Sequence, residues 1–271
     1  MNSYIKIEFQ NISQEQSDIL IAQLSEIGFE GFEEEQNKLK AFITSQNFND
    51  ELLKDISTAL QLDFSKTIIE ETNWNQVWES NFDPVIVDDF VAVRADFHEP
   101  VKGVQLEIVI TPKMSFGTGH HATTYMMMQQ MREIDFTNKV VFDFGTGTGV
   151  LAILAEKLGA NQVLAIDNDN WSIENAKENI QRNNCNAITI GLANTASVNG
   201  KFDIILANIN KNVILDNLEV LTRQLTAGGL LLLSGLLAED EHDIIAKGQQ
   251  LDLKLLSKQE RHKWLFLKFS Q

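Results

Sequence analysis

The stretch VVFDFGTGTG, residues 140–149, joins an apolar run to three glycines that alternate with threonines. We expect a strand that ends at Phe144 and a helix that begins near Gly149. Glycine lets the backbone between them turn sharply and approach the polar part of a ligand. Ligands of open α/β sheets bind outside the carboxyl ends of the strands, so this turn predicts a nucleotide-like cofactor.

The spacing of the glycines distinguishes among the cofactors that such turns bind. In the dinucleotide fingerprint GxGxxG the third glycine would occupy position 150, which is Val150 in this chain. A phosphate loop is also disfavoured, because no Gly-Lys-Ser/Thr follows the turn. The carboxylate of Asp143 would repel a pyrophosphate and suits a ligand that carries an ammonium group. We therefore take Asp143, Gly145 and Gly147 as candidate cofactor-binding residues.

Polar residues close two later strands. Asp167 ends the run LAID, where a carboxylate can accept hydrogen bonds from both hydroxyls of an adenosine ribose. The alternative role for an acidic residue there is a helix cap, which we assign to Asp169. Asn208 closes FDIILAN two units further on, at the same edge of the sheet, and its amide carries both donor and acceptor groups. These positions predict one ligand site made by several strand ends.

Apolar strands alternate with amphipathic helices after residue 139. In chain order the runs are VVFDF, GVLAILAEKLGA, QVLAIDN, WSIENAKENIQRN, FDIILANI, NVILDNLEVLTRQL and GGLLLLSG. A further helix near residues 239–248 and two strand-like runs, LDLKLLSK and KWLFLKFS, end the pattern. The alternation indicates an α/β domain with a Rossmann-like parallel sheet that is covered on both faces.

The first part of the chain follows another pattern. Residues 4–10 alternate as a strand does, and apolar residues then recur at helical spacing up to Gly28. Two short strand-like runs, a helix near 52–60 and a strand near 66–70 follow. The order βαββαβ is that of the ferredoxin-like α+β fold.

These two patterns suggest a division into domains. We expect a small α+β substrate-recognition domain over residues 1–65, a linker over 66–83 and the α/β domain over 84–271. The linker carries Trp74, Trp78 and Phe82 at a spacing of four, which predicts a connector helix with one aromatic face.

The charge of the chain limits its partners. The formal net charge is −16, with 38 acidic and 22 basic residues, and no dense basic cluster occurs along the chain. High-affinity binding to nucleic acid is therefore not expected. An acidic surface can attract a basic protein, although excess acidic residues more often serve solubility alone. The sequence shows neither a long apolar span nor a signal peptide, so we expect a cytoplasmic protein without membrane contact.

Metal and thiol chemistry are not expected either. Cys185 is the only cysteine, which excludes an intrachain disulfide. His120 and His121 are adjacent, and no HxxxH pattern or acidic partner at ligand spacing follows them. The methionines of TTYMMMQQM favour core packing.

Together the glycine turn, Asp167 and Asn208 resemble class I S-adenosylmethionine-dependent methyltransferases. The loop FGTGHHATT (residues 116–124), the linker NWNQVWESNFDP and the run ANIN further resemble the PrmA family, which methylates amino groups of large-subunit ribosomal protein eleven. The family loop commonly reads GTGTHPTT, so His120 replaces a threonine and Ala122 a proline. The small N-terminal domain agrees with the family in the order of its elements.

The resemblance implies S-adenosylmethionine as cofactor and a basic ribosomal protein as substrate. Thr124, Gly145, Asp167 and Asn208 are the implied cofactor contacts, with Phe116 and Gly117 nearby. Methyl transfer is an in-line displacement that mainly requires alignment of a neutral nucleophile, so Asn208 is the residue expected to orient the amine. Two alternatives stay open: a methyltransferase for RNA or small molecules, and a non-catalytic assembly factor that binds an adenosine ligand. The sequence does not predict the oligomeric state.

Overall fold

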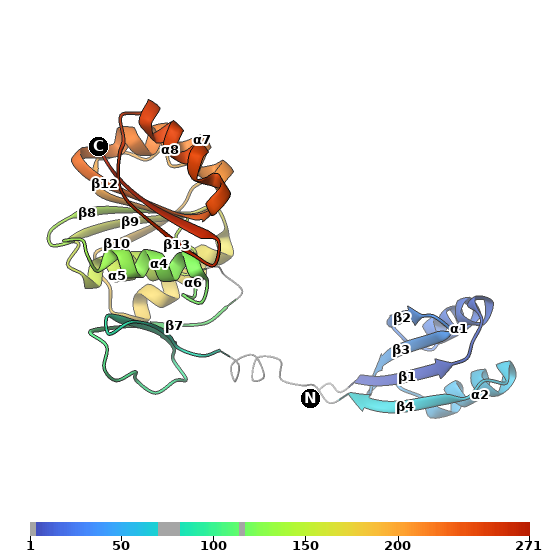
Figure 1. Cartoon of the computed structure of the whole chain (residues 1–271). Coiled ribbons are helices and arrows are strands. Elements are labelled where there is room, and N and C mark those ends of the chain that lie inside the picture. The colour runs from blue at the N-terminus through green and yellow to red at the C-terminus, as the bar shows by residue number, and fades with distance from the viewer. Residues whose placement is uncertain (1–3, 70–81, 114–116) are drawn as a thin grey trace. The chain divides into compact units, whose positions relative to one another are not determined.

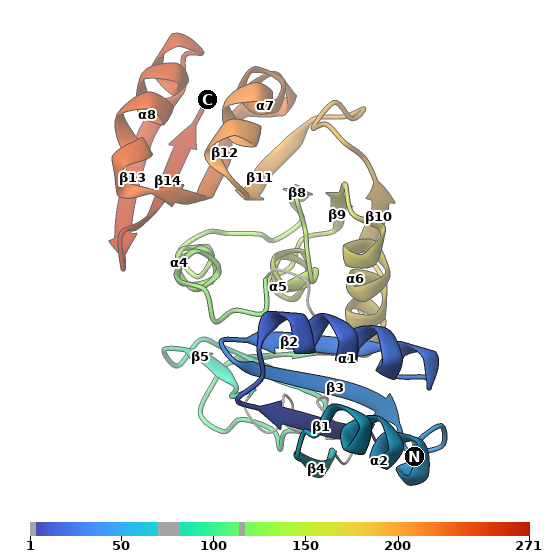
Figure 2. The same cartoon turned by 90° about the vertical axis from the view of Figure 1, so that its right-hand side faces the viewer.

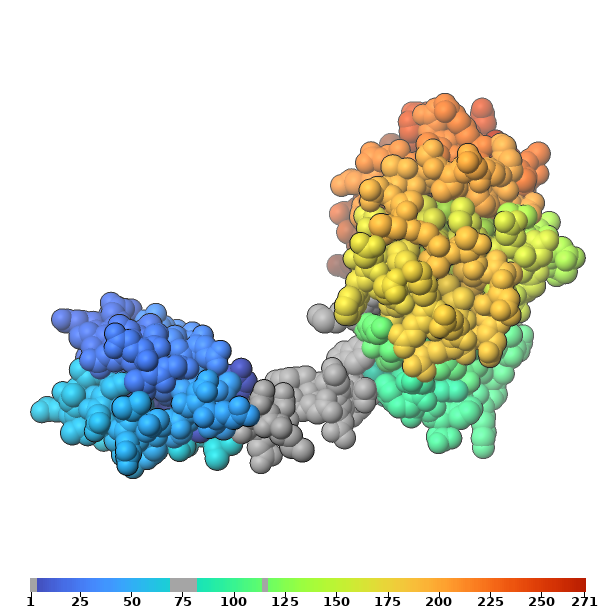
Figure 3. All heavy atoms as spheres, turned by 180° about the vertical axis from the view of Figure 1, so that it is seen from behind, coloured from blue at the N-terminus to red at the C-terminus, as the bar shows by residue number. Residues whose placement is uncertain are grey.

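The computed structural model describes residues 4–69, 82–113 and 117–271. The chain divides into two units, Met1–Asn81 and Phe82–Gln271. Within each unit the described residues pack closely together, as the spheres of Figure 3 show. Trp74 and Trp78 of the expected linker lie outside the described residues. No helix of the described residues is long and apolar enough to cross a membrane.

The N-terminal unit has the predicted βαββαβ order. Its elements are β1 (Tyr4–Gln10), α1 (Gln14–Glu26), β2 (Gly31–Glu35), β3 (Lys38–Thr44), α2 (Asp50–Leu60) and β4 (Phe64–Ile69). The strands form one antiparallel sheet in the order β2-β3-β1-β4, and buried residues such as Ile7, Phe9 and Leu20 make its core. Strand β4 continues past residue 65, the expected end of the domain, because its pairing with β1 extends to Ile69.

The larger unit contains two sheets (Figure 1). A small one comprises β5 (Val85–Val87), β6 (Val91–Ala95) and β7 (Leu106–Ile110). The strands of the large one are β8 (Val140–Phe144), β9 (Gln162–Asp167), β10 (Ile188–Leu192), β11 (Phe202–Asn208), β12 (Leu225–Leu237), β13 (Lys254–Arg261) and β14 (Trp264–Ser270). Their order is β10-β9-β8-β11-β12-β14-β13, and β14 runs antiparallel to both of its neighbours.

Helices cover both faces of the large sheet, as Figure 2 shows. One face is packed by α4 (Ala122–Met131), α5 (Val150–Lys157) and α6 (Asn170–Arg182), and the other by α7 (Lys211–Gln224) and α8 (Glu241–Gln250). Successive residues of β8 serve opposite faces, since Val141 packs with α4 and α5 while Phe142 packs with α7 and α8. The four methionines of α4 are fully buried, so the prediction of core packing is confirmed.

Two asparagines of α6 and the asparagine that caps its C-terminal end bond the edge of β7 where a neighbouring strand would otherwise lie. Asn183 bonds both backbone groups of Val109, with distances of 3.0 and 2.7 Å. Asn179 accepts from the Thr111 amide at 2.8 Å and donates to the Thr148 carbonyl at 2.8 Å. Asn175 donates to the Thr111 carbonyl at 3.1 Å. Side chains four residues apart share one helix face, so this row satisfies polar groups at the free edge of β7 and holds α6 in register.

We expect Asn179→Ala to destabilise the larger unit, because it leaves two buried backbone groups without partners. The free energy of unfolding should fall by about 2–4 kcal/mol, as measured by urea denaturation followed by circular dichroism. Asn161→Ala, the same change at an exposed position, is the matched control. A loss for Asn179→Ala no larger than that of the control would contradict the role of the asparagine row.

Candidate functional site

A cavity of about 440 Å³ lies at the carboxyl ends of the central strands. In the order of the strands β8 lies beside β11, and the chain continues from β8 to β9 on one side and from β11 to β12 on the other, which opens a crevice between β8 and β11. The cavity is lined by His121, Phe144, Gly145, Gly147, Asp167, Asn168, Ser172, Ala193, Asn194, Asn208, Ile209, Asn210, Val213, Gly235 and Trp264. Its volume suits a small-molecule ligand.

The glycine turn forms one wall of this cavity. Gly145 has a φ of +79°, and a Cβ added there would lie 2.3 Å from Cγ2 of Ile209. Any larger residue at this position is therefore excluded by both backbone conformation and space. The amides of Gly145 and Thr146 each donate to the Ile166 carbonyl at 2.9 Å, which ties the turn to the end of β9.

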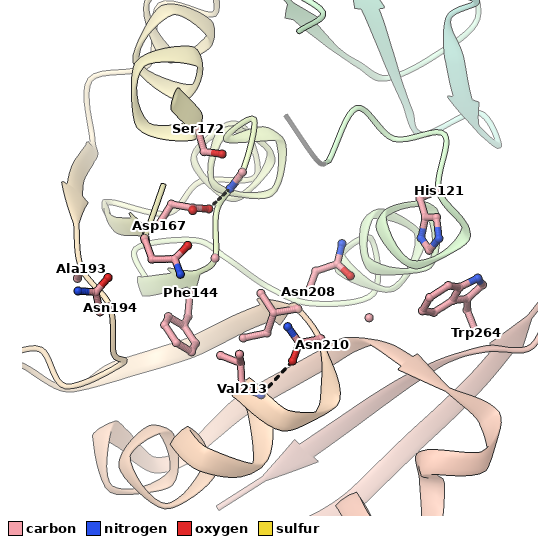
Figure 4. A pocket seen from close by; sticks show the side chains of 15 residues that line it. His121, Phe144, Asp167, Ser172, Ala193, Asn194, Asn208, Asn210, Val213 and Trp264 are labelled. Carbon is pink, nitrogen blue, oxygen red and sulfur yellow. Dashed lines mark hydrogen bonds between the residues drawn. The ribbon is translucent and has the colours of Figure 1, made fainter. Parts of the chain in front are cut away.

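Asp167 lies at the end of β9 and faces the cavity (Figure 4). One carboxylate oxygen accepts from the Gly147 amide at 2.9 Å, and the other accepts from the Asp169 amide at 3.1 Å. Asp169 itself caps α6 by accepting from the Ser172 amide, as expected from the sequence. The carboxylate of Asp167 is thus held in one orientation and can still accept hydrogen bonds from a ligand.

Asn208 ends β11 and lies in the middle of the cavity wall in Figure 4. Its Nδ2 donates to Oγ1 of Thr124 at 3.0 Å, and both residues are buried. Its Oδ1 is buried as well, yet it finds no hydrogen-bond partner among the described residues. A buried acceptor without a partner is costly, which indicates that a ligand completes this contact.

Asp143 is not part of the cavity wall. Its side chain is 1% exposed, and Oδ2 accepts from Oγ1 of Thr146 at 2.6 Å. Burial, together with the nearby charge of Asp167, raises the pKa of this carboxyl from an ordinary value of 3.8 to about 7. Asp143 therefore supports the glycine turn from behind.

The loop that precedes α4 lies beside the glycine turn. The carbonyl of Gly117 accepts from Oγ1 of Thr148 at 2.8 Å. Gly117, Thr124 and Asn208 line a narrow adjoining cavity of about 10 Å³. Phe116, the remaining candidate from the sequence, lies outside the described residues.

Several lining residues were not found by sequence reasoning. Ala193 and Asn194 follow β10, and Asn210 caps α7 by accepting from the Val213 amide at 3.1 Å. The run ANIN contains Asn210, so its second asparagine was an available signal. Trp264 had no such signal, because the antiparallel strand β14 brings it to the cavity from the end of the chain.

His121 and Trp264 form the end of the cavity opposite Asp167 (Figure 4). Their rings lie 4.4 Å apart at an angle of 72°. Burial lowers the pKa of His121, so its ring is neutral near pH 7. Within the described ranges no three histidine, cysteine or acidic side chains are grouped so as to hold a metal ion.

The pKa of Asp143 makes the stability of the fold depend on pH. Because the folded state holds this proton up to about pH 7, stability falls as the pH rises from about 4 through 7. An asparagine at this position has no carboxyl to ionise, so it would remove the fall in stability with rising pH, and its amide oxygen can still accept from Thr146. Asp143→Asn should therefore raise the free energy of unfolding by up to about 4 kcal/mol at pH 8 and little at pH 4. Denaturation at several pH values measures the difference, with Asp216→Asn as the exposed control. A difference that stays constant across this range would contradict the assignment.

Comparisons with known proteins agree with this geometry. The family model described as ribosomal protein L11 methyltransferase (PrmA) matches residues 4–271. The ribosomal protein L11 methyltransferase of Porphyromonas gingivalis is 40% identical over 264 residues, which cover 93% of this chain and 90% of that protein. The one of Phocaeicola vulgatus is 34% identical over 276 residues, which cover 98% of both chains.

A solved structure gives the same result. The crystal structure of the ribosomal protein L11 methylase from Lactobacillus delbrueckii subsp. bulgaricus is similar with a TM-score of 0.66 and 30% identity, covering 70% of this chain and 99% of that chain. The predicted Rossmann-like class I methyltransferase fold and the resemblance seen in the sequence are confirmed. The chain belongs to the ribosomal protein L11 methyltransferase (PrmA) family.

Proposed function

We propose that this enzyme transfers methyl groups from S-adenosylmethionine to amino groups of ribosomal protein L11. The observation that carries the proposal is the cavity that Asp167 and Asn208 line together, with the buried Oδ1 of Asn208 left without a hydrogen-bond partner among the described residues. Relatives along almost the whole chain are named for methylation of this protein. The acceptors are a lysine ε-amine, the N-terminal α-amine, or both.

The lining residues fit the proposed cofactor. Asp167 would accept from the ribose hydroxyls, and Ala193 and Asn194 lie beside it, where the adenine would bind. The positively charged part of the cofactor is favoured by the carboxylate of Asp167, which lines the cavity. Gly145 leaves room for Ile209, which also lines the cavity, because no side chain projects from the turn there.

Asn208 would align the acceptor. The bound cofactor supplies an electrophilic methyl group on a sulfonium. Because Nδ2 of Asn208 is engaged with Thr124, its Oδ1 is the atom left to accept an N–H from the amine or the cofactor. The neutral amine then needs alignment and exclusion of water, and no acid/base pair is required.

The acceptor is proposed to enter from the end formed by His121 and Trp264, which we call the acceptor end. Asn208 lies between this end and Asp167 (Figure 4). The methylene stem of a lysine packs well on aromatic rings, and a neutral His121 does not repel the amine. The net charge of −16 would attract a basic ribosomal protein.

We assign the proposed roles to the domains that the sequence predicts. Residues 1–65 would recognise the protein substrate, residues 66–83 would link the domains, and residues 84–271 would carry out the transfer. We place the enzyme in the cytoplasm, where its substrate is made.

A mass spectrum of L11 tests the function. Incubation of purified L11 with the enzyme and S-adenosylmethionine should add about 14 Da per methyl group. The same mixture with ribosomal RNA in place of L11 is the parallel arm. Methylated RNA together with unmodified L11 would favour an RNA methyltransferase. Cofactor binding without transfer to any ribosomal fraction would favour a non-catalytic assembly factor.

Asp167→Asn should weaken the binding of S-adenosylmethionine about 10-fold to 100-fold, because hydrogen bonds to a charged acceptor are worth about 1.5–3 kcal/mol. Titration calorimetry measures the dissociation constant directly. Asp169→Asn is the matched control, since asparagine still caps a helix and Asp169 does not line the cavity. Normal binding by Asp167→Asn would remove Asp167 from the proposed site.

A further inference from the structure

The side chain of His120 connects the loop that precedes α4 to the segment that precedes β5. Nε2 lies 2.9 Å from the carbonyl oxygen of Asp83, and Nδ1 lies 3.2 Å from Oγ1 of Thr118. The ring meets that of Phe82 edge-on, with centroids 4.8 Å apart. His120 thus joins the start of the larger unit to the loop Gly117–His121.

The other side of this contact is firmly packed. Phe82 is 7% exposed, belongs to the main core and stacks on His98 with ring centroids 6.1 Å apart. Gly119 is buried and lies close to Val85 in β5, because a Cβ added there would lie 3.4 Å from the Cβ of Val85. The loop therefore lies against residues 82–85, and His120 bonds it to them.

The loop also reaches the cavity. His121, the next residue, caps α4 because its Nδ1 accepts from the Thr123 amide at 3.4 Å, and Nδ1 also lies 2.7 Å from Oγ1 of Thr123. Its ring lines the acceptor end. Thr124 follows in the same helix and orients the amide of Asn208. A shift of the loop would therefore move both groups that face the acceptor.

We infer that His120 is a positioning residue for methyl transfer: it holds the loop Gly117–His121 on residues 82–85 and thereby fixes His121 and Thr124 at the acceptor end. The inference rests on the proposed function. Asp167 ends β9, and its partners Gly147 and Asp169 lie in the turn after β8 and at the N-cap of α6, so the contacts that hold Asp167 do not involve His120.

His120→Thr tests the inference. We expect kcat/KM for L11 to fall roughly threefold to tenfold, the equivalent of one lost hydrogen bond, while the dissociation constant of S-adenosylmethionine changes less than about twofold. His120→Gln should restore most of the loss, because its amide nitrogen can donate to the Asp83 carbonyl in the same way. His242→Thr, at a side chain 92% exposed, is the control for the substitution itself.

Hydrogen exchange supplies a readout without activity. In the absence of substrate, the peptide that contains residues 117–124 should exchange faster in His120→Thr than in the wild type, and His120→Gln should reduce the difference. Unchanged exchange and unchanged kcat/KM in His120→Thr would overturn the inference, as would equal losses in L11 and cofactor binding. If the wild-type enzyme does not methylate L11, the proposed function fails, while the exchange experiment still decides whether His120 holds the loop.

Discussion

The hydrogen bond from the Gly147 amide to the Asp167 carboxylate is the contact on which the site depends. It is 2.9 Å long and joins the turn after β8 to the end of β9, its parallel neighbour. Charge-assisted bonds of this kind fix the orientation of the acceptor. Gly145 allows no Cβ against Ile209, so the turn also constrains the residue that follows Asn208. Three strand ends are thus fixed relative to one another without any ligand.

Two acidic side chains lie close to the same turn, and one of them is buried. Asp143 is buried under the turn and Asp167 lies at its mouth, and their mutual repulsion adds to the cost of burial. A cation in the cavity offsets this repulsion, since an opposite charge favours the ionised carboxylates. Under the proposed function, the sulfonium charge of the cofactor would supply this compensation, and the product, which lacks that charge, would not.

The sequence was sufficient for the features that follow from strand ends. Parallel strands bring their carboxyl ends to one edge, which is why Gly145, Asp167 and Asn208 line one cavity. Asp143 does not line the cavity, because its side chain bonds Thr146 behind the turn. The next residue, Phe144, lines the cavity instead. The place of Trp264 in the cavity could not be predicted from the sequence, because local periodicity does not reveal that β14 lies between β12 and β13.

The two ends of the cavity are supported differently, and this difference has a functional meaning. Near Asp167 the wall is made by consecutive strand and helix units, and the asparagine row of α6 ties that helix to β7 and to the Thr148 carbonyl. The acceptor end instead combines a loop, through His121, with a C-terminal strand, through Trp264. Because the acceptor end is built from segments other than the glycine turn, a substitution there can change how the acceptor is held and leave the turn intact. His120 is placed for such an effect, because its contacts are with Asp83 and Thr118, whereas the glycine turn is bonded to Asp167.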